Sequence, residues 1–150
     1  MSKRPATTPE SPWVVYDYEV EMFTELRKVD LAIYPKVIVN AIVESMLLHL
    51  RILVEILISK GYPDDIKLKD HLLPKFESRL VDELRAKYGD GKREGTPCWT
   101  LNKRLAHPSL SRSSSHDYTP VVDALVPCIL PLLDEIDRAR EPSTRAISRP

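Results

Sequence analysis

The chain contains little of what most phosphate-binding, metal-binding and hydrolase motifs require. Only 4 of its 150 residues are glycine, so no glycine-rich loop is available to cradle nucleotide phosphates. Its 4 histidines form no His-Glu-x-x-His motif, and its serines form no Gly-x-Ser-x-Gly elbow. The 2 cysteines, Cys98 and Cys128, are far apart, which excludes a Cys-x-x-Cys pair and is typical of core thiols in a reducing compartment. We therefore expect neither a metal ion nor a cofactor.

Net charge and long apolar runs are missing as well. Lysine and arginine together number 22, as do aspartate and glutamate, so the overall charge indicates neither a nucleic acid nor a membrane surface as a partner. No uncharged apolar run reaches the length of about 18 residues that a membrane span needs. The amino-terminal residues lack the apolar segment of a secretory signal. These absences predict a cytoplasmic protein that makes no membrane contact.

Apolar residues instead recur with helical spacing along most of the chain, and no segment alternates with the period of a β-strand. The pattern predicts a single domain with an all-α fold, an antiparallel helical bundle of four main helices plus short helical pieces. The domain is expected at residues 13–140, between a disordered amino-terminal tail of residues 1–12 and a flexible carboxy-terminal tail of residues 141–150. The main helices are expected at residues 17–31, 35–60, 74–88 and 120–138.

The last predicted helix contains two prolines, Pro127 and Pro131, four residues apart. A proline inside a helix lacks the backbone N–H that bonds to the preceding turn, and it costs about 3 kcal/mol in a straight helix. We therefore expect a kink at this point or a break between two short helices.

The longest predicted helix, residues 35–60, is apolar around most of its circumference. At about 100° per residue, one narrow polar stripe contains Asn40, Glu44, Arg51 and Glu55. A helix of this kind is either central in a bundle or shared between two subunits. We expect a homodimer that uses this helix.

Two polar side chains of the long helix are candidates for more than packing. Arg51 has two interpretations, an ion pair with Glu44 or Glu55 within the helix, or a cation that faces a cleft. His49 falls on the apolar side, where a hydrogen-bonded core histidine is the expected role.

Candidate chemistry concentrates in residues 99–112. Thr96 followed by Pro97 is a helix start, because the threonine hydroxyl caps the first turn and proline suits its first position. Pro108 ends that helix, so His107 is expected at its carboxyl end, where a protonated imidazole is favoured. Such a histidine suits general acid–base catalysis, although a histidine at a helix end is also commonly a cap or a surface residue.

His107, Asn102 and an arginine form a set that suits metal-independent phosphodiester chemistry. The imidazole would move protons at a ribose 2′-hydroxyl or at the leaving oxygen, and a guanidinium would stabilise the charge on phosphorus. The same residues also suit a plain binding surface.

Positive charge is clustered around this segment. Residues 85–116 contain seven lysines and arginines against two acidic residues, Asp90 and Glu94. Such a cluster suits contacts with phosphate groups, although a run of this size is also typical of a solvated face. The residues expected to contact RNA or a nucleotide are Lys103, Arg104 and Arg112.

Three stretches together resemble the HEPN superfamily. In chain order they are Glu44-Ser-Met-Leu-Leu-His-Leu-Arg-Ile-Leu-Val-Glu-Ile-Leu, Asp64-Asp-Ile-Lys-Leu-Lys-Asp-His and Leu101-Asn-Lys-Arg-Leu-Ala-His, and the likeness spans residues 35–136. The resemblance implies an all-helical bundle that commonly dimerises and that, in active members, cuts RNA without metal through an Arg-x(4–6)-His motif. His107 matches the motif histidine, and Asn102 matches the polar residue that often follows the motif arginine. The arginine itself would fall at Leu101 or Asn102, so Arg51 from the long helix, or Arg104 or Arg112 nearby, would have to replace it.

Two hypotheses follow. The first is a non-catalytic HEPN-like module with a degenerate motif, of toxin or defence type, that binds RNA, a nucleotide or an antitoxin-like partner protein. The alternative is a metal-independent endoribonuclease. In that enzyme His107 moves the proton, Asn102 orients the histidine or the phosphate, and Arg51 replaces the motif arginine.

Overall fold

A computed structural model describes residues 11–58, 62–106 and 117–140. Within these ranges all regular structure is helical, which confirms the predicted all-α class. The elements are α1 (Pro12–Leu26), η1 (Leu31–Ile33), α2 (Lys36–Ile58), η2 (Leu68–Leu72), α3 (Arg79–Tyr88), α4 (Pro97–Thr100), η3 (Leu101–Ala106) and α5 (Thr119–Ala139). The element η1 is a 3₁₀ turn, and η2 and η3 are π-helical. The predicted carboxy-terminal tail and the first ten residues of the amino-terminal tail lie outside the described residues.

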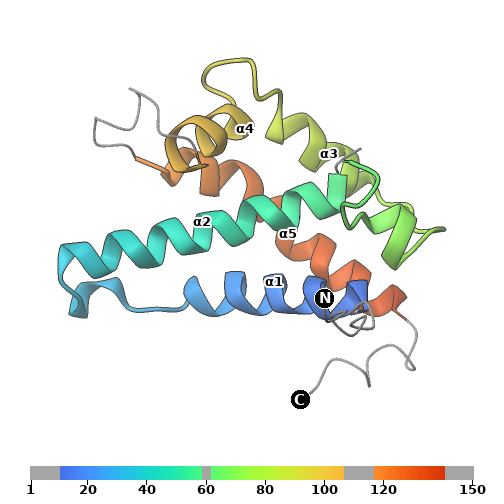
Figure 1. The fold of residues 1–150 in the computed structure, drawn as a ribbon, viewed down its shortest axis with the longest axis horizontal. Coiled ribbons are helices and arrows are strands. Elements are labelled where there is room, and N and C mark those ends of the chain that lie inside the picture. The colour runs from blue at the N-terminus through green and yellow to red at the C-terminus, as the bar shows by residue number, and fades with distance from the viewer. Residues whose placement is uncertain (1–10, 59–61, 107–116, 141–150) are drawn as a thin grey trace, which may run out of the picture.

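Helices α1 and α2 form a hairpin along the length of the molecule (Figure 1). Ser11 caps α1 by accepting a hydrogen bond from a first-turn N–H, and Pro12 occupies the first helical position. The helix therefore begins before residue 17, and Pro12 belongs to the domain rather than to the predicted tail. It ends at Leu26, earlier than expected, and Asp30 then caps the separate turn η1.

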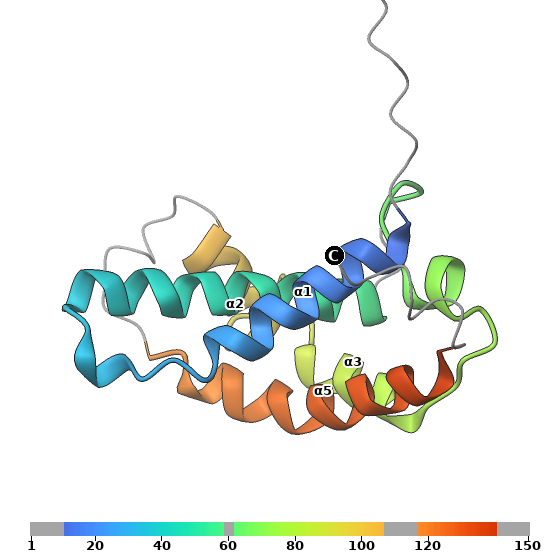
Figure 2. The same ribbon diagram turned by 90° about the horizontal axis from the view of Figure 1, so that it is seen from below.

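Helices α3 and α5 pack together beneath this hairpin (Figure 2). One apolar core joins the layers, and its fully enclosed side chains are Phe23, Leu47, Leu50, Leu53, Val54, Leu84, Leu101, Leu125, Ile129, Leu132 and Ile136. Every buried residue of α2 lies at Leu47 or later, and Val43 and Met46 before it are partly buried against the core. At the amino end of the helix, Lys36, Val37 and Ile38 are exposed.

Of the two outcomes expected for the last helix, a kink or a break, the break does not occur. Helix α5 runs without interruption through Pro127 and Pro131. Both prolines lie on the exposed side of the helix, so the carbonyl groups that lose a partner face solvent rather than the core. The opposite side of α5 supplies buried side chains along its whole length, and this burial offsets the two missing hydrogen bonds.

Helix α3 is shorter than predicted, since it begins at Arg79 rather than at residue 74. Ser78 caps it by accepting a hydrogen bond from the backbone N–H of Leu80. Its predicted end is confirmed, because Gly89 follows its last residue with a positive φ of 74°.

Two polar pairs join α1 to the rest of the fold. Nδ1 of His49 lies 2.6 Å from Oε2 of Glu19, and both side chains are buried. The Arg140 guanidinium donates to Oδ1 of Asp17 at 2.7 Å and lies over the Trp13 ring, 4.2 Å from its centroid. His49 is thus a hydrogen-bonded core residue, as predicted.

Candidate functional site

The candidate site is built on the loop that leads from α3 to α4. Gly89 brings the backbone so close to Thr96 that a Cβ at position 89 would lie 2.8 Å from Cγ2 of Thr96. The Thr96 hydroxyl donates to the carbonyl oxygen of Asp90 at 2.6 Å and accepts from the N–H of Trp99 at 3.2 Å. The predicted Thr96-Pro97 helix start is therefore confirmed, and the same threonine closes the loop.

Beyond α4 the chain winds into the π-helical segment η3. Such segments are uncommon and often occur at functional sites, because the wider turn changes the direction of the side chains. Leu101 is fully enclosed and fixes the start of η3 in the core, whereas Lys103 is exposed and Arg104 is half-buried. The segment packs against α2, the helix that carries Arg51.

Arg51 forms an ion pair within its own helix. Its Nε donates to Oε1 of Glu55 at 3.0 Å, and 24% of the arginine side chain remains exposed. The intrahelical interpretation of Arg51 is thus observed, with Glu55 rather than Glu44 as its partner. The ion pair partly offsets the positive charge of the Arg51 guanidinium.

Three side chains that the sequence did not connect meet beside this ion pair. Nδ2 of Asn102 lies 3.5 Å from Sγ of Cys98, and Oδ1 of Asn102 is buried with no hydrogen-bond partner among the described residues. Burial raises the pKa of the Cys98 thiol, so this cysteine is a weak nucleophile. Burial, and next the neighbouring Cys98, raises the pKa of the Tyr88 hydroxyl well above its usual range. Both groups are therefore neutral near pH 7.

No sequence pattern indicated this cluster, because its members come from α3, α4 and η3 and share no short motif. Gly91 packs over it, since a Cβ there would lie 3.0 Å from Nδ2 of Asn102 and 3.3 Å from Sγ of Cys98. The Asn102 amide is therefore held between the loop and α4. The closest described neighbours of this amide are Cys98 on α4 and Gly91 in the loop.

Two of the predicted site residues, His107 and Arg112, lie outside the described residues. The structure brings together the elements that carry the others, because η3 with Asn102 packs on α2 with Arg51. Among the described residues no group of three or more histidine, cysteine, aspartate or glutamate side chains is arranged to hold a metal ion.

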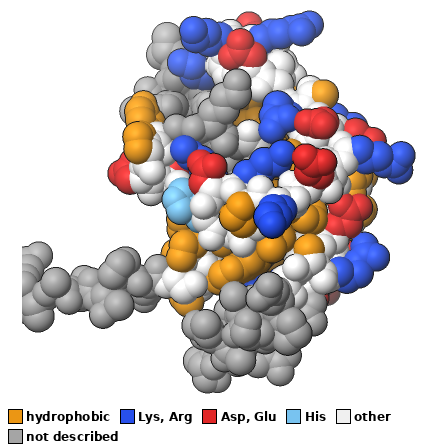
Figure 3. All heavy atoms as spheres, turned by 90° about the vertical axis from the view of Figure 1, so that its right-hand side faces the viewer, with side chains coloured by type: hydrophobic (Ala, Val, Ile, Leu, Met, Phe, Trp, Pro, Cys, Tyr) orange, Lys and Arg blue, Asp and Glu red, His pale blue; other side chains and the backbone are white. Residues whose placement is uncertain are grey.

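Three basic residues, Lys92, Arg93 and Lys103, are exposed in this part of the molecule, and together we call them the basic edge. These exposed residues lie on the loop after α3 and on η3, at the top of the view in Figure 1. Residues 85–106 include six basic residues and two acidic ones, Asp90 and Glu94, which are exposed on the same loop as Lys92 and Arg93. At the end of the molecule that carries η2, by contrast, basic and acidic side chains are interspersed around apolar atoms (Figure 3).

Comparison of the chain with protein-family models, with curated proteins and with solved structures found no match.

Proposed function

We propose that this protein is an RNA-binding helical module of the HEPN type that does not cleave its ligand. The observation that carries the proposal is the basic edge, whose three exposed cations lie on a loop and a π-helical turn that are fixed to the core. Exposed lysines and arginines on a rigid support suit the phosphate backbone of RNA, and they need no metal. As a module of the HEPN type, the protein would act in a toxin or defence system.

Two features favour binding over cleavage. The Arg51 guanidinium is held by Glu55, so its charge is partly neutralised within its own helix. Leu101, which stands at one of the two positions expected for the motif arginine, is enclosed in the core. With Arg51 committed to Glu55, the transition state of phosphodiester cleavage loses the electrostatic stabilisation expected from this guanidinium.

Charge reversal on the basic edge is expected to weaken RNA binding. The double substitution Lys92→Glu with Arg93→Glu removes two phosphate contacts and adds two repulsive charges, so we expect the affinity for a labelled single-stranded RNA to fall at least about tenfold. The slope of log affinity against log salt should also become shallower by about 1.4, since each contact on a single strand contributes about 0.7. Fluorescence anisotropy over a salt series measures both quantities.

A matched control is available away from the edge. Lys69→Glu with Lys75→Glu makes the same change in net charge at two exposed positions near the mixed-charge end. This variant should keep most of the affinity. Equal losses in both double variants would mean that only net charge matters, and they would contradict a localised RNA surface. If the chain binds no RNA but does bind a partner protein, its function is protein binding rather than RNA binding.

A second candidate, metal-independent RNA cleavage by His107, is favoured by one observation. The segment η3 ends at Ala106 against α2, so the residue before His107 belongs to an element in contact with the helix of Arg51. In this case Asn102 orients the imidazole or the phosphate, and Arg51 exchanges Glu55 for the phosphate.

The variant His107→Ala tests this candidate. If the protein cleaves RNA, this substitution should lower the rate by at least about 100-fold, whereas a chelator should change nothing. Expression in bacteria, with growth and RNA integrity as readouts, offers the protein the whole range of cellular RNA as substrate. His71→Ala, at an exposed histidine on η2, is the control. Robust cleavage by the His107 variant ends this candidate.

A further inference from the structure

A groove between α1 and the second half of α5 has the size and the walls of a small-molecule site. The carboxyl end of α5 lies beside the amino-terminal half of α1 (Figure 1). The groove between them has a volume of about 460 Å³, within the range of about 300–1,000 Å³ that is typical of such sites. Its apolar walls come from both helices and consist of Val20, Leu130, Leu133 and Ile136. We call this cavity the α1–α5 groove.

Tyr16 lines the α1–α5 groove, and its hydroxyl forms no hydrogen bond with a described residue. The residue is only 5% exposed, and its ring packs edge-on against Trp13 with the two centroids 5.5 Å apart. Burial, and next the neighbouring Asp17 carboxylate, raises the pKa of the Tyr16 hydroxyl well above its usual range, so the group is neutral near pH 7. A buried polar group without a partner destabilises the fold, and a ligand that bonds to it removes this cost.

Asp17 is a second polar residue of the groove whose hydrogen bonds are incomplete. Nη1 of Arg140 donates to Oδ1 of Asp17 at 2.7 Å, and the guanidinium lies over the Trp13 ring. Oδ2 of the same carboxylate is buried and has no hydrogen-bond partner in the described part of the chain. An ionised carboxylate accepts hydrogen bonds and cannot donate them, so the missing partner of Oδ2 is a donor.

The groove also carries more negative than positive charge. Asp134 and Asp137 of α5 line it together with Asp17, against the guanidinium of Arg140. The Asp134 carboxylate forms no ion pair with a described residue, and the neighbouring Arg138 donates to the backbone carbonyl oxygen of Asp134. This excess of two negative charges attracts cations and repels anions.

We propose that the α1–α5 groove binds a small organic cation, a primary amine on an apolar body. A primary ammonium has three N–H donors and no acceptor, and the groove offers it a carboxylate oxygen without a donor, a hydroxyl oxygen and further carboxylates. The apolar body packs against the walls, and the removal of its surface from water adds affinity. A carboxylate or phosphate ligand fits poorly, because it meets three aspartates.

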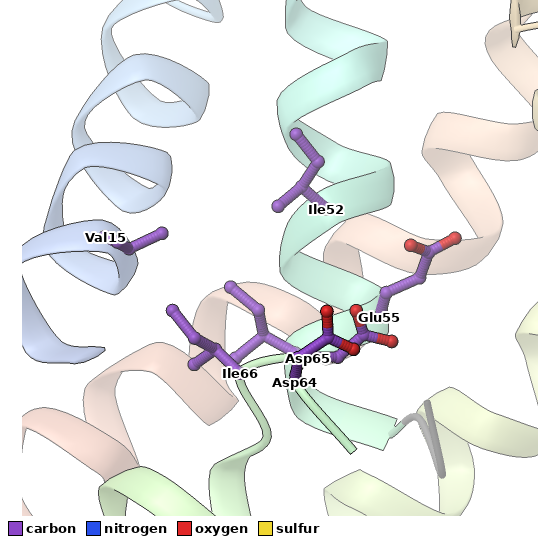
Figure 4. A pocket seen from close by; sticks show the side chains of 7 residues that line it. Val15, Ile52, Glu55, Asp64, Asp65 and Ile66 are labelled. Carbon is purple, nitrogen blue, oxygen red and sulfur yellow. The ribbon is translucent and has the colours of Figure 1, made fainter. Parts of the chain in front are cut away.

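A second pocket shows what the α1–α5 groove has in addition to negative charge. It lies beside the carboxyl end of α2, has a volume of about 290 Å³ and carries the carboxylates of Glu55, Asp64 and Asp65 (Figure 4). Glu55 is bonded to Arg51, and Asp65 accepts a hydrogen bond from the backbone N–H of Tyr62 at 2.6 Å. None of the three acidic residues is buried. This pocket therefore supplies a control for the effect of charge alone.

Isothermal titration calorimetry on the full chain tests the inference with hexylamine, phenethylamine and tryptamine. We expect at least one of these amines to bind with a dissociation constant below about 1 mM, which a ligand of about ten heavy atoms reaches in a well-formed site. The corresponding alcohols, hexanol, phenethyl alcohol and tryptophol, keep the apolar body but lack the charge, so they should bind at least about tenfold more weakly. Binding of none of the amines, or equal binding of amine and alcohol, overturns the inference.

Tyr16→Phe tests the contact with the hydroxyl. Because this hydroxyl forms no hydrogen bond with a described residue, its removal should leave the thermal unfolding midpoint unchanged or raise it. The affinity for the amine should nevertheless fall about fivefold, since the ammonium loses one hydrogen-bond partner. An unchanged affinity overturns the assignment of Tyr16 to the site.

Asp134→Asn tests the charge of the groove. This side chain has no ion pair to lose, so the fold should be unaffected, whereas the affinity for the amine should fall about tenfold. Asp64→Asn is the control, because it removes the same charge from the pocket beside α2 and should change the affinity less than about twofold. Circular dichroism establishes that both variants keep their helices. Equal losses in the two variants overturn the inference. Because RNA affinity is measured separately, failure here leaves the proposed RNA-binding role intact.

Discussion

Glu19→Ala is expected to lower the free energy of unfolding by about 3 kcal/mol, a large part of the stability of a domain of this size. The carboxylate lies 2.6 Å from Nδ1 of His49, and the side chains of the pair are only 9% and 10% exposed. Removing the carboxylate leaves the imidazole buried without its partner, and the full desolvation cost of that group then falls on the folded state. Urea denaturation followed by circular dichroism measures the loss.

Two further variants separate this cause from others. Glu21→Ala changes an exposed glutamate of the same helix and should cost no more than about 0.5 kcal/mol. In the double variant Glu19→Leu with His49→Leu no polar group of the pair is left unpaired, so its stability should return to within about 1 kcal/mol of the original. If Glu19→Ala costs as little as Glu21→Ala, the pair does not hold the hairpin together.

The features that the sequence predicted well are those set by neighbouring residues. Helical spacing of apolar side chains depends on a few consecutive turns, so the all-α class and the positions of the long helices could be predicted. The start at Thr96 and Pro97 and the end at Gly89 also depend on local chemistry alone. The role of His49 as a hydrogen-bonded core residue was predictable because the residue falls on the apolar side of its helix.

The features that the sequence did not predict depend on contacts between residues that are far apart in the chain. Glu19 meets a histidine 30 residues away, and Asp17 meets Arg140 across 123 residues. The continuity of α5 through its prolines depends on which side of the helix faces solvent, and propensity alone does not include that effect. For the same reason the apolar pattern of α2 did not show which part of the helix is buried, and the structure buries no residue of it before Leu47.

Gly89→Ala is expected to cost about 3 kcal/mol of unfolding free energy, for two separate reasons. The residue has a φ of 74° and a ψ of −155°, a region of backbone conformation that is essentially restricted to glycine. An added Cβ would also lie 2.8 Å and 2.9 Å from side-chain carbons of Thr96, closer than van der Waals contact allows. Because Thr96 caps α4, the strain passes to the segment that presents Lys103.

Gly95→Ala separates the two contributions. Gly95 also has a positive φ, of 87°, but nothing lies within 4 Å of an added Cβ. Its substitution should therefore cost only the conformational part, about 1 kcal/mol, and the difference between the two variants measures the contact with Thr96. Equal losses at both positions would show that the loop moves to make room. Thr96→Ser in the Gly89→Ala background removes the clashing methyl group and keeps the capping hydroxyl, so it should recover about 1 kcal/mol if the contact is the cause.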